Sequence, residues 1–303
     1  MATADNAAQQ RPDADRGGLL ARHPLISFFV MAYAFSWIVW SPWYLSEDGV
    51  GLLPFELSDT VGGLLNTAAL IAGPTLSAFI VTGATEGRAA IRHLLRRIVR
   101  WRVGFKWYLF VLIGIPLIML LGAIILPGTL ASFEATSIPS GLTYLGFFVA
   151  VMVFGGPLFE EIGWRGFALP HLQPLRGPLV ASLILGLLWS LWHLPLFLTR
   201  TWDTPHGSLL DIVLFVVSAT AVAIIFTWVF NNTRGSVLMA ILGHASLNVF
   251  GTFLVGAFPT PIMTASLLGW GTGSVVAAVL IIVFTRGHLG YREEEPELAA
   301  APT

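Results

Sequence analysis

Two adjacent glutamates and an arginine lie within a strongly apolar part of the sequence. The segment FGGPLFEEIGWRGF, residues 154–167, contains Glu160, Glu161 and Arg165. A charged side chain at the centre of a bilayer costs about 3 kcal/mol on the insertion scale, so charges in such a segment indicate a functional site. Glu161 and Arg165 are four residues apart, so on a helix they share one face and can neutralise each other. Glu160 points about 100° away from that pair.

Three further polar residues lie in other apolar segments. His193 belongs to the segment LLWSLWHLP, and His244 and Asn248 belong to the segment HASLN. His244 and Asn248 are four residues apart, which places both on one helix face. The tryptophans beside His193 can wall its ring, and Pro195 is expected to end or kink that helix. Charged and polar residues on three helices predict one polar cavity where these helices meet.

These residue types can hydrolyse a peptide bond within the membrane. A free carboxylate with a histidine can activate water as general base and acid, and a second histidine with an amide can stabilise an oxyanion. Glutamate with two histidines is also a catalytic zinc set, so Glu160, His193 and His244 could instead be zinc ligands. An amide is an uncommon zinc ligand but a good oxyanion donor, so Asn248 beside His244 favours a site without metal. No cofactor is favoured, and zinc stays open.

The composition is that of a membrane protein. Hydrophobic residues make up 55% of the 303, the mean hydropathy is +0.78 and 11% are charged, where a soluble domain has about a quarter. A net charge of −1 gives no electrostatic reason to expect nucleic-acid binding. The absence of cysteine excludes disulfides, thiolate metal sites and cysteine nucleophiles. The expected partners are membrane lipids and a membrane-associated peptide or protein substrate.

The fold class expected is an all-α polytopic membrane protein with about eight transmembrane helices and an intramembrane polar cavity. A spanning helix needs about 20 mostly apolar residues. Eight stretches of the sequence qualify, at about 25–45, 61–83, 106–126, 142–171, 177–198, 210–230, 237–257 and 267–285. The expected organisation has four parts. Residues 1–23 form a polar tail, and residues 24–141 form three helices with a basic interfacial helix. Residues 142–255 form a catalytic core, and residues 256–303 form a last helix with an acidic tail.

The distribution of basic residues predicts the orientation. Cytoplasmic loops collect Lys and Arg. With the N-terminus inside, all sixteen Lys and Arg fall on the inner side except Arg165 and Arg200. Both termini are therefore expected in the cytoplasm, and the cell membrane is the expected location. The segment 88–109 predicts a helix on the inner leaflet whose arginines reach the head groups, with an apolar stripe of Ile91, Leu94, Leu95 and Ile98.

Depth in the membrane restricts the length of the fourth helix. If that helix continues to about Leu172, Glu160 lies about 18 Å and His193 about 22 Å from the inner edge. The same rise per residue, counted from Val237, places His244 about 10 Å and Asn248 about 16 Å from the inner edge. The four residues can meet only in this version, so we expect one long helix over 142–171. The Gly-Gly-Pro sequence at 155–157 is expected to permit close packing or a kink.

Three motifs carry a family resemblance. EEIGWRG matches the EExxxR motif of the CPBP family, which includes CAAX prenyl proteases, bacteriocin-processing proteins and lysostaphin resistance protein A-like proteins. HASLN matches the HxxxN motif. WSLWH resembles the FxxxH motif, with Trp189 in place of the phenylalanine. The resemblance covers residues 142–255 and agrees with the eight-helix members of the family.

The resemblance implies an intramembrane endopeptidase. It assigns water activation to Glu160 and His193, the oxyanion site to His244 and Asn248, and a supporting ion pair to Glu161 and Arg165. A prenylated CAAX substrate does not follow, because bacterial-type members need not share it.

Two other classes of protein stay open. Submerged Glu, His and Arg also suit a proton-coupled transporter, for which an internal repeat with paired broken helices would be expected. A non-hydrolytic scaffold or bacteriocin-immunity protein could bind a partner through the same cavity, and its biological role would tolerate Glu160→Gln. His171 is expected at the inner interface. The remaining histidines are expected to be solvated, namely His23, His93, His206 and His288.

Overall fold

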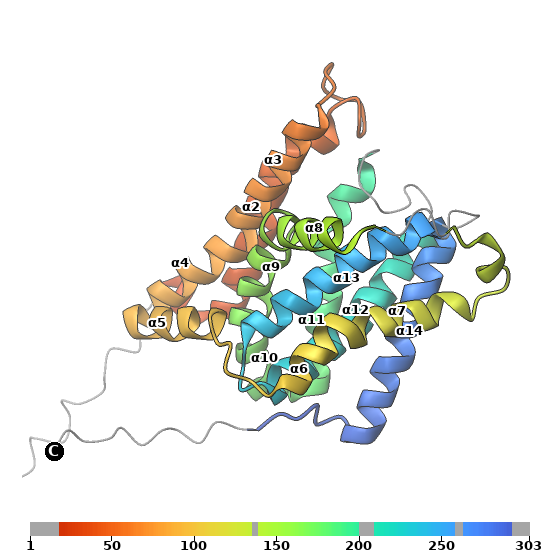
Figure 1. The fold of residues 1–303 in the computed structure, drawn as a ribbon. Helices are drawn as coiled ribbons and strands as arrows, with labels where there is room; N and C mark the ends of the chain where they lie inside the picture. The colour runs from red at the N-terminus through yellow and green to blue at the C-terminus, as the bar shows by residue number, and fades with distance from the viewer. Residues whose placement is uncertain (1–17, 135–138, 200–208, 258–262, 293–303) are drawn as a thin grey trace, which may run out of the picture.

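The computed structural model describes residues 18–134, 139–199, 209–257 and 263–292 (Figure 1). Within these ranges the regular structure is helical throughout. Three π-helical turns interrupt longer helices, η1 (Ile71–Thr75), η2 (Phe110–Gly114) and η5 (Trp164–Ala168). The other elements are α1 (Leu19–Arg22), α2 (Pro24–Leu45), α3 (Asp59–Leu70), α4 (Leu76–Thr85), α5 (Gly87–Ile98), α6 (Phe105–Leu109), α7 (Ile115–Ile124), η3 (Leu130–Ser132), α8 (Gly141–Phe154), α9 (Pro157–Gly163), α10 (Leu169–Arg176), α11 (Pro178–Trp192), η6 (Leu194–Leu198), α12 (Leu209–Asn232), α13 (Val237–Ala257) and α14 (Met263–Thr285).

The all-α polytopic fold is confirmed, but the number of eight spans is not. Six described helices are long and apolar enough to cross a membrane, at Pro24–Leu45, Asp59–Thr85, Phe105–Ile124, Pro178–Leu198, Leu209–Asn232 and Val237–Leu254. A seventh span results only if α8 and the helix that follows it are counted as one. Within α14, the apolar stretch Gly271–Thr285 is shorter than each of these six spans.

The single helix expected over 142–171 is wrong, because the chain bends by 41° between α8 and Pro157–Arg176. Gly156 takes φ +116°, a conformation open to glycine but strained for other residues. Pro157 follows at the first position of α9, where its missing N–H costs nothing. Of the two alternatives expected at the Gly-Gly-Pro sequence, close packing or a kink, the structure shows a kink. Beyond it, α9, η5 and α10 continue to Arg176, which keeps the long stretch below Glu160 that the depths require.

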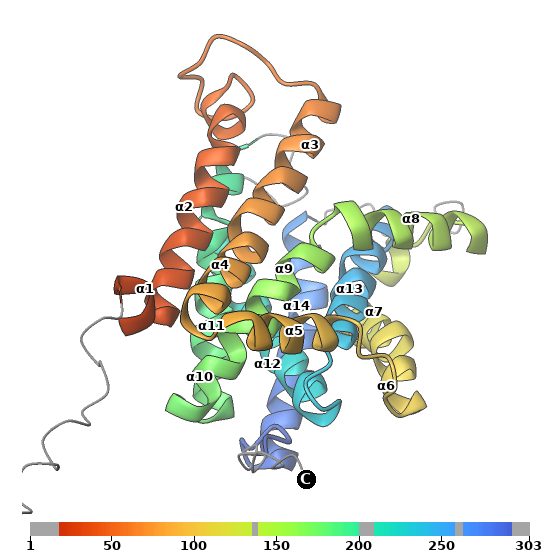
Figure 2. The same cartoon turned by 90° about the vertical axis from the view of Figure 1, so that its left-hand side faces the viewer.

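The helix that carries the glutamates runs through the centre of the bundle. Every residue from 160 to 169 is buried, whereas α8 has no buried residue. Figure 2 shows α9 between α4 and α13. A Cβ on Gly163 would come within 2.6 Å of the Pro74 side chain, so a glycine is needed where α9 meets η1. This close approach holds the charged residues away from the lipid.

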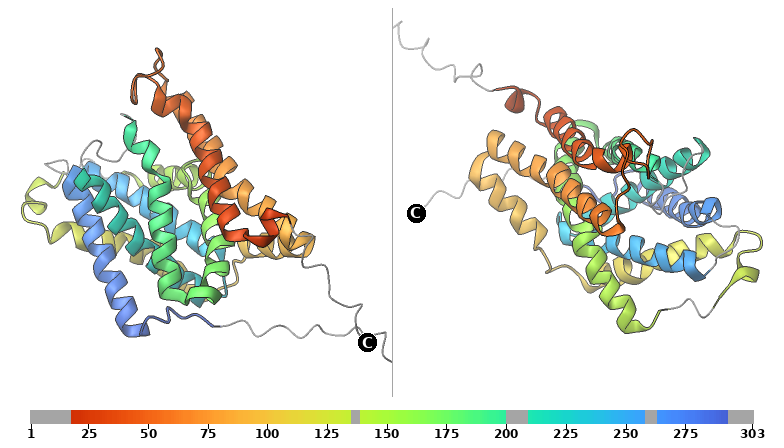
Figure 3. Two further views of the ribbon diagram at one scale, coloured as in Figure 1. Left: turned by 180° about the vertical axis from the view of Figure 1, so that it is seen from behind. Right: turned by 90° about the horizontal axis from the view of Figure 1, so that it is seen from above.

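A tight hairpin brings the histidine of α11 back to the glutamates of α9. Gly177, at φ +71°, ends α10, and Pro178 begins α11 directly afterwards. Figure 3 shows α10 and α11 packed side by side, and the two helices run in opposite directions. The turn therefore returns the end of α11 to the depth of α9. As expected from Pro195, α11 ends at Trp192, and a short 3-10 helix follows.

The basic segment after α4 forms α5, which turns away from α4 and runs across the bundle (Figure 2). Of the expected apolar stripe, Leu94 packs into the protein, while Leu95 is 46% exposed. Arg97 is also buried and donates to the carbonyl oxygens of Arg165 and Gly166. The expectation that these arginines all reach the head groups is therefore wrong for Arg97, whose side chain binds two carbonyl oxygens within η5.

Candidate active site

Glu160 lies in the first turn of α9 and is almost completely buried, with 4% of its surface exposed. Its Oε2 atom accepts a hydrogen bond from Nε1 of Trp189 at 2.7 Å. Its Oε1 atom lies over Gly156, where a Cβ would come within 2.5 Å of it. The bend before α9 therefore makes room for the carboxylate, and α11 supplies its hydrogen-bond donor.

Glu161 and Arg165 form the ion pair expected from their spacing. Nη1 of Arg165 lies 2.9 Å from Oε1 of Glu161, and both side chains are fully buried. The guanidinium carbon also lies 5.0 Å from the ring centroids of Trp189 and Phe226, on cation–π contacts. The same Glu161 oxygen is 2.9 Å from Nδ1 of His244. One buried carboxylate thus holds both an arginine and a histidine.

His193 is the C-cap residue of α11, and its ring orientation is determined by that helix. Its Nδ1 lies 2.8 Å from the carbonyl oxygen of Trp189. Because a carbonyl only accepts, Nδ1 carries the hydrogen, and in the neutral ring Nε2 has the lone pair. The rings of Trp192 and Phe215 pack against the imidazole at 4.7 and 5.2 Å. Glu160 and His244 are close enough to His193 to interact with it electrostatically.

His244 and Asn248 lie one turn apart on α13, with different surroundings. His244 is buried, with Nδ1 donating to Glu161 and its ring 5.3 Å from that of Trp189. In the neutral ring its Nε2 is therefore also the acceptor nitrogen. Asn248 is half-buried, and its amide makes no hydrogen bond to any residue in the described ranges. Asn248 is thus the neutral donor with spare hydrogen-bonding capacity at this level of the bundle.

Trp189 connects the charged residues, a role that sequence reasoning did not assign to it. Its N–H binds Glu160, its carbonyl binds His193, and its ring contacts Arg165 and His244. The sequence was interpreted only as placing an aromatic wall at this position. A signal was present, because tryptophan replaces phenylalanine in the FxxxH pattern and adds an N–H that phenylalanine lacks.

The three residues that could be zinc ligands do not form a metal site in this geometry. Among the described residues, no three His, Asp or Glu side chains are grouped so that they could hold a metal ion. Glu160 directs one carboxylate oxygen to an indole N–H, a donor that competes with metal coordination at that atom.

The remaining histidines lie outside this cluster. His171 is half-buried at the end of the bundle that carries α5, where its Nε2 lies 3.0 Å from Oε1 of Glu86. The expected solvation of His23, His93 and His288 is confirmed by their exposure. The expectation for His206 lies outside the described residues.

The fold and site define a polytopic α-helical membrane protein with a buried Glu–His–Arg cluster at its centre. Residues 142–250, which contain the whole cluster, match the family model for the type II CAAX prenyl endopeptidase Rce1-like family. The chain is also 25% identical over 267 residues to CAAX prenyl protease 2 of Methanococcus maripaludis, an alignment that covers 84% of this chain and 92% of the relative. The resemblance predicted from the three motifs is confirmed, and the chain carries an Rce1-like domain of the CPBP family. These likenesses support its assignment to the CPBP-type intramembrane endopeptidases.

Proposed function

We propose that this protein hydrolyses a peptide bond at membrane depth with a water molecule activated by Glu160 and His193, without a metal ion. The observation that carries the proposal is that both groups are positioned by one residue. Trp189 donates its N–H to Glu160 and accepts from Nδ1 of His193 through its carbonyl. The lone pair on Nε2 of His193 and the carboxylate of Glu160 can then accept both hydrogens of one water, which directs the water's oxygen toward the substrate.

The reaction proceeds through a tetrahedral intermediate. The water oxygen bonds to the carbonyl carbon while Glu160 takes one water proton, and the carbonyl oxygen becomes an oxyanion. Glu160 then transfers that proton to the amide nitrogen, the carbon–nitrogen bond breaks, and a carboxylic acid and an amine are released. Each proton that leaves the water is thus accounted for, and Glu160 acts first as base and then as acid.

His244 and Asn248 are proposed to stabilise the oxyanion, but they differ in the protonation state that lets them donate a hydrogen bond to it. Asn248 donates from its neutral amide. His244 already uses its Nδ1 hydrogen on Glu161, so it can donate from Nε2 only as the imidazolium. Glu161 and Arg165 are proposed to support the site by holding His244 in place. Removing one oxyanion donor costs about 10²- to 10³-fold in kcat in well-studied hydrolases.

The proposed substrate class is a prenylated C-terminal peptide. This class comes from the name of the archaeal relative, CAAX prenyl protease 2. A site enclosed by membrane-spanning helices is compatible with a substrate whose lipid keeps it in the bilayer.

We also propose the orientation that the basic residues indicate. The chain lies in the cell membrane, with both termini in the cytoplasm.

The test is a cleavage assay with the purified full-length chain in lipid nanodiscs. A fluorescence-quenched farnesylated CAAX peptide should be cut by the wild type and not by Glu160→Gln, and the unprenylated peptide should be cut more slowly. Addition of 1,10-phenanthroline should leave the rate unchanged. Activity that stops with this chelator and returns with zinc would overturn the metal-independent mechanism. A Glu160→Gln variant that keeps full cleavage would overturn the catalytic assignment itself.

A further inference from the structure

α2 lies outside residues 142–250, the segment that matches the family model, yet two of its side chains bind backbone carbonyls of α11. Nε1 of Trp37 donates to the carbonyl oxygen of Trp192 at 2.9 Å. One turn earlier on α2, the hydroxyl of Tyr33 donates to the carbonyl oxygen of Leu188. The rings of Tyr33 and Trp37 contact each other, with their centroids 5.3 Å apart. We refer to these two side chains as the α2 clamp.

The α2 clamp binds a carbonyl at the very end of α11. The last carbonyls of an α-helix have no N–H partner within the helix, and Trp192 is the last residue of α11. The N–H of Leu196, which would continue the helical pattern to Trp192, binds the carbonyl oxygen of His193 instead, at 2.9 Å. The indole of Trp37 therefore supplies a hydrogen bond that the end of the helix leaves open.

The residue that follows this carbonyl is His193, the C-cap of α11. The last turn of the helix orients its ring, because Nδ1 of His193 binds the carbonyl oxygen of Trp189 and the imidazole packs on the ring of Trp192 at 4.7 Å. Helix ends fray unless further contacts hold them. The α2 clamp binds the carbonyls at both ends of this turn, those of Leu188 and Trp192, and so limits the movement of His193.

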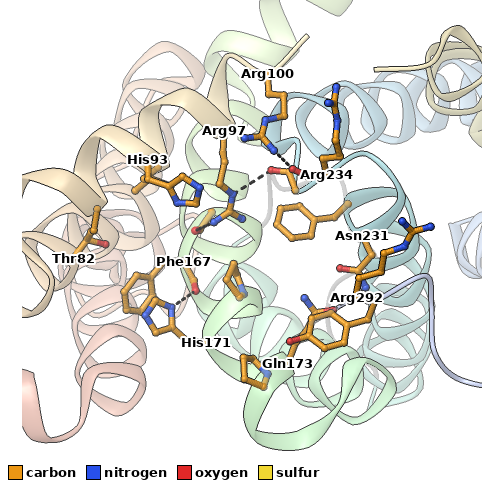
Figure 4. A pocket seen from close by; sticks show the side chains of 18 of the residues that line it. Thr82, His93, Arg97, Arg100, Phe167, His171, Gln173, Asn231, Arg234 and Arg292 are labelled. Atoms are coloured by element: carbon orange, nitrogen blue, oxygen red, sulfur yellow. Dashed lines mark hydrogen bonds between the residues drawn. The ribbon is translucent and has the colours of Figure 1, made fainter. Parts of the chain in front are cut away.

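α5, which also precedes the matched segment, makes contacts of the same kind. Arg97 donates to the carbonyl oxygens of Gly166 and Gly235 at 3.3 and 3.2 Å (Figure 4). These carbonyls lie in η5 and in the turn before α13. Side-chain donors from the N-terminal helices thus hold the backbone of helices that carry the site. The contacts of the α2 clamp differ in lying directly beside a proposed catalytic residue.

We propose that Trp37, assisted by Tyr33, is a positioning residue for His193, and that α2 is therefore part of the catalytic unit. This inference rests on the proposed hydrolysis. His193 can share one water with Glu160 only while its Nε2 is directed at that water, and a small displacement of a catalytic group can lower a rate by orders of magnitude. Trp37 acts on the backbone before His193 and takes no part in proton transfer.

The experiment compares Trp37→Phe with Trp40→Phe in the full-length chain, purified in lipid nanodiscs, with the farnesylated peptide as substrate. Both changes remove an indole N–H from α2 and leave an aromatic ring. Trp40 also packs on Trp192, at 4.7 Å, but its Nε1 donates to Oδ1 of Asn66 at 3.1 Å and not to α11. Trp40→Phe therefore controls for lost packing and one lost hydrogen bond. The readouts are kcat, KM, Tm and hydrogen exchange of the backbone over 188–199, measured by mass spectrometry.

Trp37→Phe should lower kcat by about 3- to 10-fold with little change in KM, the range that corresponds to one neutral hydrogen bond. Hydrogen exchange over 188–199 should become faster. Tyr33→Phe should act in the same direction but more weakly, because Leu188 lies inside the helix. Trp40→Phe should lower Tm and change kcat by less than about twofold. Adding Trp37→Phe to His193→Ala should change the residual rate, followed over long incubations, by less than about twofold, because the group through which Trp37 acts is gone.

Equal losses of kcat in Trp37→Phe and Trp40→Phe would overturn the positioning role. A further loss on adding Trp37→Phe to His193→Ala would overturn it too, since a general structural effect lowers every rate. Unchanged kcat and unchanged exchange in Trp37→Phe would overturn the α2 clamp itself. A wild type that cleaves no peptide, or a Glu160→Gln variant that cleaves fully, would instead overturn the proposed function and the positioning role with it. Faster exchange in Trp37→Phe would then leave the clamp as a structural contact.

Discussion

The indole Nε1 of Trp189 donates a hydrogen bond to Oε2 of Glu160 at 2.7 Å, from a helix that reaches Glu160 only through the turn at Gly177. This contact joins the carboxylate proposed to activate water to the residue whose carbonyl orients His193. A phenylalanine, the residue of the family pattern at this position, would keep the aromatic wall and lose the donor. The contact is therefore a feature of this chain whose contribution can be measured by one substitution.

Trp189→Phe should lower kcat by about 10- to 100-fold, since a hydrogen bond to a charged group contributes about 1.5–3 kcal/mol. The measurement is steady-state cleavage of the farnesylated peptide, with KM determined separately. The matched control is Trp192→Phe. Trp192 is also buried, but its Nε1 has no hydrogen-bond partner among the described residues. Equal losses of kcat in both variants would assign Trp189 a packing role only.

Glu160→Gln should leave the stability of the protein nearly unchanged, whereas Glu161→Gln should lower it. A glutamine at 160 still offers an oxygen to Trp189, so this variant should be inactive with a Tm close to wild type. Glu161→Gln removes the charge that holds both Arg165 and His244, and breaking a buried pair costs about 3–5 kcal/mol. Its Tm or yield should fall clearly below that of Glu160→Gln. Similar thermal unfolding of the two variants would contradict the separate roles of these neighbours.

Gly156→Ala should damage the site through the backbone. The residue has φ +116°, and its new Cβ would lie 2.5 Å from Oε1 of Glu160, so we expect destabilisation of more than about 1 kcal/mol and a large loss of cleavage. Gly146→Ala is the control, because it lies within α8 with no atom near the added Cβ; there alanine should stabilise the helix by about 0.5–1 kcal/mol. Normal activity in Gly156→Ala would show that the bend does not position Glu160.

Asn248→Ala should lower kcat by about 10²- to 10³-fold with little change in KM, as expected when an oxyanion donor is lost. Its Tm should change little, because the amide makes no hydrogen bond to a residue in the described ranges. The informative comparison is between kcat and Tm measured on the same preparation. A variant that loses Tm and keeps kcat would identify Asn248 as a structural residue of α13.

The orientation can be measured with single cysteines, since the chain has none of its own. Glu56→Cys and Arg88→Cys place a thiol at exposed positions on opposite sides of the span Asp59–Thr85. In intact cells a membrane-impermeant maleimide should label position 56, and position 88 should react only after the cells are opened. Labelling of position 88 from outside would reverse the orientation proposed from the basic residues.

Properties that depend on neighbouring positions along the chain could be predicted without a structure. Hydropathy over about 20 residues located the membrane helices, and the four-residue spacing of Glu161 and Arg165 predicted their ion pair because a helix repeats every 3.6 residues. The Gly-Gly-Pro sequence indicated either close packing or a kink, but it did not decide between the two. That bend depends on how α9 packs into the bundle.

The contacts that organise the site were decided by the tertiary structure. Trp189 reaches Glu160 across 29 residues, and His244 reaches Glu161 across 83. Arg97 turns inward from an amphipathic helix to the carbonyl of Arg165, 68 residues away. Sequence periodicity cannot predict such pairs, because each pair depends on the crossing angle and the rotation of two packed helices. The side-chain volumes along the whole interface determine that angle and that rotation. The sequence alone identified the polar residues; the packing of α9, α11 and α13 determined which atoms of those residues meet.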